Sequence, residues 1–250
     1  MAMPHQITNR KRNYDRAASI GRSFLSEGLN ALAYVAGGLI FLIGSVFFLP
    51  AFEQYAAAGA WMFIVGSVLY LAVTCSDFVE NILHFRHHPP RSRKAFFEFG
   101  SSALYLIGSL IFVIGSVLFL PSLELKSWGG GCFLVGSTIF VIAACINVTQ
   151  ITQAGSLATL QMLNITAICF VVGSVLFLVA SVPYLWGGSG SIKTILLSYM
   201  GAQFVAGSFL FFTGGIVNAY RAYRVHQSHS STGARKSGGE RSSATATTTR

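Results

Sequence analysis

Three histidines occur in the string HFRHH, and two carboxylate residues precede them. On a helix, Asp77, Glu80, His84 and either His87 or His88 would recur along one side at steps of three and four residues. Imidazole nitrogens and carboxylate oxygens at this spacing can bind zinc or another transition metal, as a metal-dependent sensor would. The alternative is an ordinary polar turn beside a membrane, because the two prolines that follow would end the helix. We favour the turn and predict neither a metal site nor a cofactor.

A second group of polar residues stands at a fixed distance from three glycines. The residues eleven positions after Gly66, Gly136 and Gly207 are Asp77, Asn147 and Asn218, and those three positions further on are Glu80, Gln150 and Arg221. Eleven steps of about 100° return a side chain to within roughly 20° of the glycine's face. These six residues could form a polar cup that opens to the cytoplasm, with Glu80 paired to Arg221. The alternative, which we favour, is hydrogen bonding between helices and capping at the membrane boundary.

The sequence lacks the motifs of common catalytic sites. It contains no G-x-x-x-x-G-K-[ST] phosphate loop, no G-x-S-x-G and no H-E-x-x-H. Its four cysteines form no C-x-x-C pair, and we interpret them as small buried hydrophobic residues; they are Cys75, Cys132, Cys145 and Cys169. We therefore predict that the protein is not an enzyme.

The composition indicates which elements carry these residues. The chain has 250 residues, of which 53% are hydrophobic and 10% charged, against about 25% charged in a typical soluble protein. Six continuously apolar runs are each long enough to cross a hydrocarbon layer of about 30 Å. Their approximate limits are 30–50, 57–77, 101–121, 128–148, 160–182 and 194–217. We predict an all-α membrane protein with six transmembrane helices.

Positive charge is concentrated on one side of these predicted helices. Of the 17 Lys and Arg residues, all but Lys126 and Lys193 precede the first run, lie between the second and third, or follow the sixth. By the positive-inside rule both termini of this multi-pass protein are then cytoplasmic. The net charge of +9 predicts contact with anionic lipids of the inner leaflet rather than with nucleic acid.

One motif, F-x-x-G-S, occurs once in each predicted helix. Its glycine and serine residues are Gly44 and Ser45, Gly66 and Ser67, Gly115 and Ser116, Gly136 and Ser137, Gly173 and Ser174, and Gly207 and Ser208. Small residues let helices approach closely in lipid, and the serine can donate to the carbonyl four residues earlier. We interpret the motif as helix packing within three tandem hairpins, in the first of which Gly44 and Gly66 should meet at one depth. The alternative is a ring of serines that lines a narrow path.

Two of these hairpins carry a longer common pattern. FLIGSVFFLP with GAWMFIVGS, and FVIGSVLFLP with GGCFLVGS, resemble the YrhK-like family of small bacterial membrane proteins. The second copy has Cys132 where the first has tryptophan. The third hairpin keeps FVVGS, lacks the proline that follows in the other two, and has an insertion in its outer loop. The resemblance implies a membrane location and this hairpin unit, and it transfers no catalytic residues.

We divide the chain accordingly. The predicted segments are a cytoplasmic N-terminal segment (1–28), a first hairpin (29–80), a basic loop (81–100), a second hairpin (101–150), a divergent third hairpin (158–220) and a disordered cytoplasmic tail (226–250). We expect a structural, assembly or envelope-stress component of the membrane, as a homo-oligomer or with a membrane protein partner. The competing interpretation is a transporter or channel for a small neutral or weakly polar solute.

Overall fold

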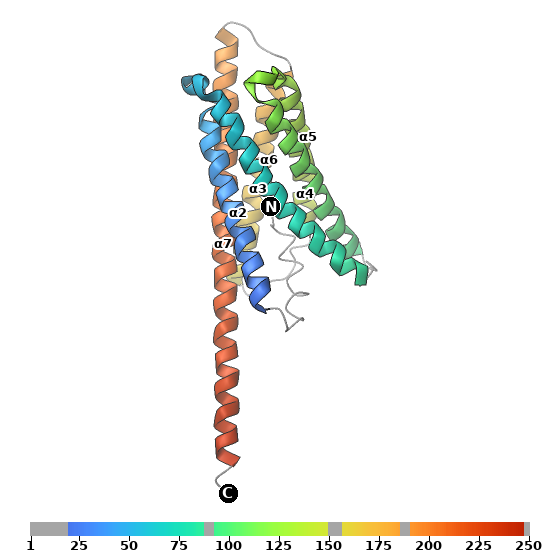
Figure 1. Ribbon diagram of the computed structural model, residues 1–250, viewed down its shortest axis with the longest axis vertical. Coiled ribbons are helices and arrows are strands. Elements are labelled where there is room, and N and C mark those ends of the chain that lie inside the picture. The colour runs from blue at the N-terminus through green and yellow to red at the C-terminus, as the bar shows by residue number, and fades with distance from the viewer. Residues whose placement is uncertain (1–19, 88–92, 150–156, 186–190, 248–250) are drawn as a thin grey trace.

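Six α-helices make up most of the protein. The computed structural model describes residues 20–87, 93–149, 157–185 and 191–247, and every regular element within them is helical. The helices are α2 (Ile20–Val46), α3 (Ala56–His87), α4 (Arg93–Leu118), α5 (Lys126–Val148), α6 (Leu157–Ser181) and α7 (Ser191–Thr247) (Figure 1). All six are long and apolar enough to cross a membrane. The predicted all-helical, multi-pass membrane protein is confirmed.

Short 3-10 helices form the turns at the end of the bundle that we take as its outer side. They cover Pro50–Tyr55, Pro121–Leu123 and Val182–Leu185. A proline begins each of the first two, where its missing N–H and fixed φ suit the first turn of a helix. Helix α6 continues for eight residues beyond Gly173, whereas α2 ends two residues beyond Gly44. The third hairpin is thus longer on this side.

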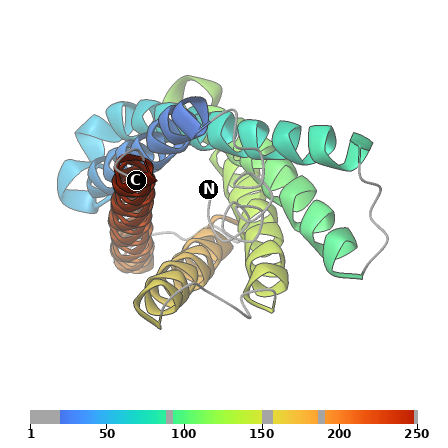
Figure 2. The same cartoon turned by 90° about the horizontal axis from the view of Figure 1, so that it is seen from below.

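The helices form a closed ring. Each helix packs against the next in the chain, and α7 packs back against α2. In the view from below, the six helices surround a common centre (Figure 2). The ring therefore consists of three hairpins, α2–α3, α4–α5 and α6–α7. Helix α2 begins and α7 ends at the same end of the bundle (Figure 1).

Phenylalanine rings fill the centre of this ring. The motif phenylalanines of α3, α5 and α7 are Phe63, Phe133 and Phe204, and each is at most 1% exposed. Their ring centroids are 5.8, 6.0 and 6.2 Å apart, within the range of favourable aromatic contacts. Because the three residues hold equivalent positions in the repeat, these near-equal distances indicate a pseudo-threefold axis. We call these three residues the phenylalanine triad.

Within the first two hairpins, each motif glycine faces the motif phenylalanine of its partner helix. A methyl group at Gly66 would lie 3.2 Å from Phe41, and one at Gly44 would lie 3.1 Å from Phe63. The expectation that Gly44 and Gly66 meet at one depth is therefore wrong. They are offset by about one helical turn, because each phenylalanine fills the groove beside the opposite glycine. The second hairpin repeats this arrangement.

The third hairpin has a different register. Gly173 lies against Phe211, Gly207 lies against Phe177, and a methyl group at Gly173 would be 3.0 Å from the Gly207 carbonyl oxygen. These phenylalanines follow their glycines by four residues, whereas the motif phenylalanines precede theirs by three. The helix pair is therefore shifted by seven residues, about 10 Å along the axis. The longer outer end of α6 accommodates this shift.

Several predicted boundaries need correction. The basic loop expected at 81–100 is mostly helical, since α3 runs to His87 and α4 begins at Arg93. The tail expected to be disordered from 226 instead continues α7 as far as Thr247 (Figure 1). Extending a formed helix requires no new nucleation, and α7 contains no proline to end it.

Candidate functional site

Four of the six motif serines form contacts between neighbouring hairpins. The hydroxyl oxygens of Ser67 on α3 and Ser116 on α4 are 3.0 Å apart, and Ser116 is also 2.8 Å from the Phe112 carbonyl oxygen. A hydroxyl has one proton, so Ser116 donates to Phe112 and accepts from Ser67. Ser45 similarly donates to the carbonyl of Phe41 at 2.7 Å and lies 2.9 Å from Ser208. All six motif serines are buried.

In the third hairpin a different serine donates to the carbonyl of its own helix. Ser181 donates to the Phe177 carbonyl oxygen at 2.7 Å, as Ser45 and Ser116 do to theirs. The motif residue Ser174 has no hydrogen-bond partner among the described residues. The register shift of seven residues accounts for this exchange, because Ser181 follows Ser174 by seven positions.

Three polar residues of the proposed cup are buried, each on a different helix. Asp77 on α3, Asn147 on α5 and Asn218 on α7 are each at most 5% exposed. Arg221 is also buried, and its Nη2 donates to the Asn218 side-chain oxygen at 2.9 Å. Four of the six residues proposed for the polar cup are therefore buried, and two of them, Asn218 and Arg221, are hydrogen-bonded to each other.

The other two residues of the proposed cup are not placed there. Glu80 is exposed, so it does not lie with the buried residues of the cup. Helix α3 crosses the bundle obliquely (Figure 1), and its inner end packs on α4 through ring contacts of Phe78 and Phe85 with Phe99. This contact turns Asn81 rather than Glu80 to the inside. Gln150 lies outside the described residues.

Sequence reasoning missed several buried polar side chains at the same end. Glu98 and Ser101 on α4 are at most 4% exposed, and Ser101 Oγ lies 3.3 Å from the Asn147 side-chain oxygen. Glu98 was assigned to a loop, whereas α4 already includes it. Position in the repeat was the available signal, because Glu98 precedes Gly115 by the same 17 residues that separate Glu27 from Gly44.

Three buried tyrosines were also missed. Tyr34, Tyr70 and Tyr105 lie on α2, α3 and α4 and are at most 3% exposed. Tyr34 and Tyr105 each precede a motif glycine by ten residues, which marks them as equivalent positions. They extend the polar character of the interior from the inner end toward the aromatic core.

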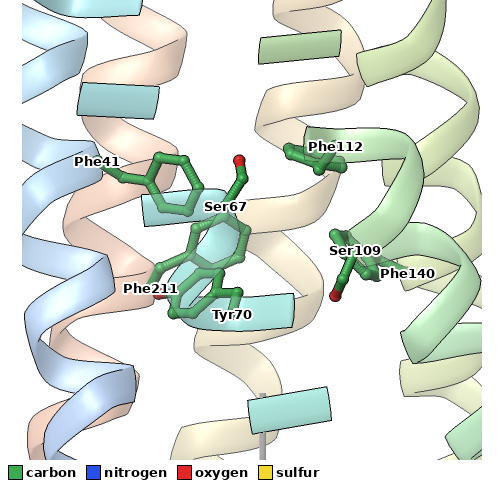
Figure 3. A pocket seen from close by; sticks show the side chains of 7 residues that line it. All are labelled: Phe41, Ser67, Tyr70, Ser109, Phe112, Phe140 and Phe211. Atoms are coloured by element: carbon green, nitrogen blue, oxygen red, sulfur yellow. The ribbon is translucent and has the colours of Figure 1, made fainter. Parts of the chain in front are cut away.

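A small cavity lies between the tyrosine level and the motif serines. It has a volume of about 10 Å³, the lower limit for one water molecule. In Figure 3 the Ser67 hydroxyl points up and the Ser109 hydroxyl points down, and the rings of Phe41, Phe112 and Tyr70 lie around the space. Carbon atoms form its surface, so the cavity is too small and too apolar to hold a solute.

The structure describes the cysteines but not the side chains of the three histidines considered as metal ligands. His88 and the side chains of His84 and His87 lie outside the part of the protein that the structure describes, so their interpretation stays a prediction. Elsewhere in the described residues no group of three or more His, Cys, Asp or Glu side chains could hold a metal. Of the four free cysteines, only Cys169 is buried; Cys75 and Cys145 are exposed on the outer surface of the bundle, contrary to expectation.

Comparison with known proteins bears on the first two hairpins. Residues 27–82 and 95–151 match the sequence model of a family described as YrhK-like protein. The first match spans most of α2 and of α3, and the second spans most of α4 and all of α5. No curated protein and no solved structure gives a significant match. The third hairpin, which has the shifted register, lies outside both matched segments.

Proposed function

We propose that this protein, whose residues 27–82 and 95–151 match the YrhK-like family model, is a non-catalytic component of the bacterial inner membrane with a structural, assembly or envelope-stress role. In this role the protein forms a rigid six-helix ring in the bilayer, and the outer surface of the ring contacts lipid or a membrane protein partner. Both termini face the cytoplasm in this proposal.

The phenylalanine triad carries this proposal. A channel or carrier along the ring axis would need a polar path through the centre, where Phe63, Phe133 and Phe204 pack with centroid separations of at most 6.2 Å. Opening such a path would require three buried aromatic side chains to move together. An interior packed in this way supports a structural role better than conduction.

The motif serines support the same role. Ser45 and Ser116 direct their protons to backbone carbonyls of their own helices and accept hydrogen bonds from neighbouring hairpins. These contacts join α2 to α7 and α3 to α4. The hydroxyls therefore connect the hairpins and are not arranged to replace the hydration shell of a passing solute.

A flux measurement tests this proposal. The purified protein is reconstituted into liposomes, and the entry of urea and glycerol is followed by stopped-flow light scattering. We expect the same rates as in protein-free liposomes, and the same rates again for Asp77→Asn. Protein-dependent entry that Asp77→Asn or Ser67→Leu alters, in variants that still fold, would contradict the proposal. Gly136→Leu should instead lower yield and thermal stability.

The location and orientation have a test of their own. A green fluorescent protein fused after residue 250 should fluoresce, because it folds in the cytoplasm, and alkaline phosphatase fused at the same place should stay inactive. Alkaline phosphatase inserted between α2 and α3 should be active. The reverse pattern would overturn the orientation that the distribution of Lys and Arg predicts.

A second candidate function is transport of a small neutral or weakly polar solute. One observation favours it, which is the burial of Asp77, Asn147 and Asn218 at equivalent positions on α3, α5 and α7. Buried ionisable groups in membrane helices are often functional. The liposome assay decides between the two candidates, because only the transporter predicts a flux that depends on Asp77.

A further inference from the structure

Three tyrosines form a layer between the aromatic core and the inner polar residues. Tyr34 and Tyr70 stack with their ring centroids 5.0 Å apart, and Tyr70 also packs on Phe41 at 5.2 Å. Tyr105 packs against Phe170 of α6 at 5.6 Å. The rings are thus held on several sides by the core, and this packing keeps the three hydroxyl groups inside the bundle.

None of the three tyrosine hydroxyls has a hydrogen-bond partner among the described residues. The Tyr34 and Tyr70 hydroxyls approach each other closely enough to interact, and so do the Tyr105 hydroxyl and the Asn147 side chain, but neither contact meets the distance and angle limits of a full hydrogen bond. Asn147 also has a buried side-chain nitrogen, Nδ2, without a hydrogen-bond partner among the described residues. The same holds for Oγ of Ser102, which precedes Tyr105 by three residues on α4.

Such a concentration of unpartnered polar atoms is unusual. Buried hydroxyl and amide groups in native proteins are nearly always hydrogen-bonded to protein or to ordered water, because leaving them unpaired costs free energy. The bilayer offers no compensating water from its hydrocarbon region. Tyrosine and serine hydroxyls both donate and accept, and the asparagine amide donates, so the missing partner must be able to do both.

We propose that Tyr34, Tyr70, Tyr105, Ser102 and Asn147 form a binding site for ordered water molecules, which we call the tyrosine layer. Water is the smallest molecule that satisfies hydroxyl and amide groups together, and a buried water commonly makes two to four hydrogen bonds. Water reaches the layer from the inner end of the ring, where the interior is lined by buried polar residues such as Asn218 and Ser101.

Two apolar regions on the outer side of the layer offer water no hydrogen-bonding partner. The cavity beside Tyr70 is surrounded by carbon atoms, and the phenylalanine triad offers no hydrogen-bonding group. We therefore expect the cavity and the triad to contain no ordered water. This inference goes beyond the proposed function, since a structural protein and a transporter could both contain such a layer.

Hydroxyl-radical footprinting of the intact protein in lipid nanodiscs tests the inference. Brief X-ray pulses convert water, including bound water, to radicals that oxidise the adjacent side chains, and mass spectrometry identifies the oxidised residues. Phe63, Phe133 and Phe204 are matched controls, because they are aromatic and equally buried. We expect Tyr34, Tyr70 and Tyr105 to be oxidised at least tenfold faster than these controls. Equal and low rates would overturn the inference.

The melting temperature of a substituted protein tests the proposal independently. If the Tyr105 hydroxyl binds water, Tyr105→Phe should lower the melting temperature, because the water loses a hydrogen bond. If that hydroxyl is unpartnered, the substitution removes a buried polar group at no loss, and the melting temperature should stay the same or rise. A stable Tyr105→Phe protein would therefore contradict the proposal. Native mass spectrometry that finds a stoichiometric non-volatile solute would overturn water as the occupant.

Discussion

Ser45 and Ser208 are 163 positions apart in the chain, and their hydroxyl oxygens lie 2.9 Å from each other. This contact joins α2 to α7 and closes the ring of helices. Ser67 and Ser116 form the same contact between α3 and α4 at 3.0 Å. In both pairs the serine of the earlier helix in its hairpin donates to its own helix and accepts from the neighbouring hairpin. The repeat therefore encodes contacts between hairpins as well as within them.

A double-mutant cycle on Ser45→Ala and Ser208→Ala should show coupling. Interhelical hydrogen bonds in membrane proteins contribute about 0.6 kcal/mol on average and at most about 1.7 kcal/mol, so we expect a coupling energy in this range. Unfolding in mixed micelles measures it. The Ser67 and Ser116 pair should give a similar value, and strictly additive effects in both cycles would show that the two contacts contribute nothing to stability.

Two glycines on α4 should respond in opposite directions to alanine. A methyl group at Gly108 would lie 2.5 Å from the Phe140 ring, whereas one at Gly100 would meet nothing within 4 Å. We expect Gly108→Ala to lose about 1–3 kcal/mol of unfolding free energy by overpacking. Gly100→Ala should gain up to about 1 kcal/mol through its higher helix propensity. Equal effects at the two sites, measured by thermal unfolding, would contradict the close packing at Gly108.

Two phenylalanines on α7 should differ in their contribution to stability. Phe204 is 1% exposed in the triad, whereas Phe209 is 55% exposed on the outer surface. Truncation of a buried phenylalanine to alanine typically costs about 3–5 kcal/mol, because it leaves a cavity. We expect such a loss for Phe204→Ala and a change within about 0.5 kcal/mol for Phe209→Ala. A mild effect of Phe204→Ala on denaturant unfolding would argue against a packed centre.

Disulfide trapping should report the register of the hairpins. In a background without the four native cysteines, Gly173→Cys with Gly207→Cys should form a disulfide, because the two glycines are directly opposed. Gly44→Cys with Gly66→Cys should not, because their offset places the sulfur atoms too far apart. Gly44→Cys with Gly59→Cys is the positive control for the first hairpin, since Gly59 faces the Gly44 carbonyl. Non-reducing gel shifts after mild oxidation measure each yield.

The candidate site could be predicted only in part. Asp77, Asn147 and Asn218 follow equivalent glycines by the same number of residues, and helical periodicity is enough to place them on one face. Glu80 follows Asp77 by three residues, and the same rule placed it on the inside. The oblique path of α3 and its contact with α4 turn Asn81 inward instead. Periodicity assumes one constant neighbour along the helix, whereas α3 packs on both α2 and α4.

The sequence by itself determined the six membrane helices, their pairing into hairpins and the small-residue motif in each, because these depend on local length, hydrophobicity and spacing. Only the tertiary structure decided the return of α7 to α2, the central phenylalanine triad and the shifted register of the third hairpin. Three hairpins with these same local sequences could also pack side by side in an open row, without contact between the first helix and the last. Closure into a ring depends on contacts between residues as distant as Ser45 and Ser208, and no local pattern contains that information.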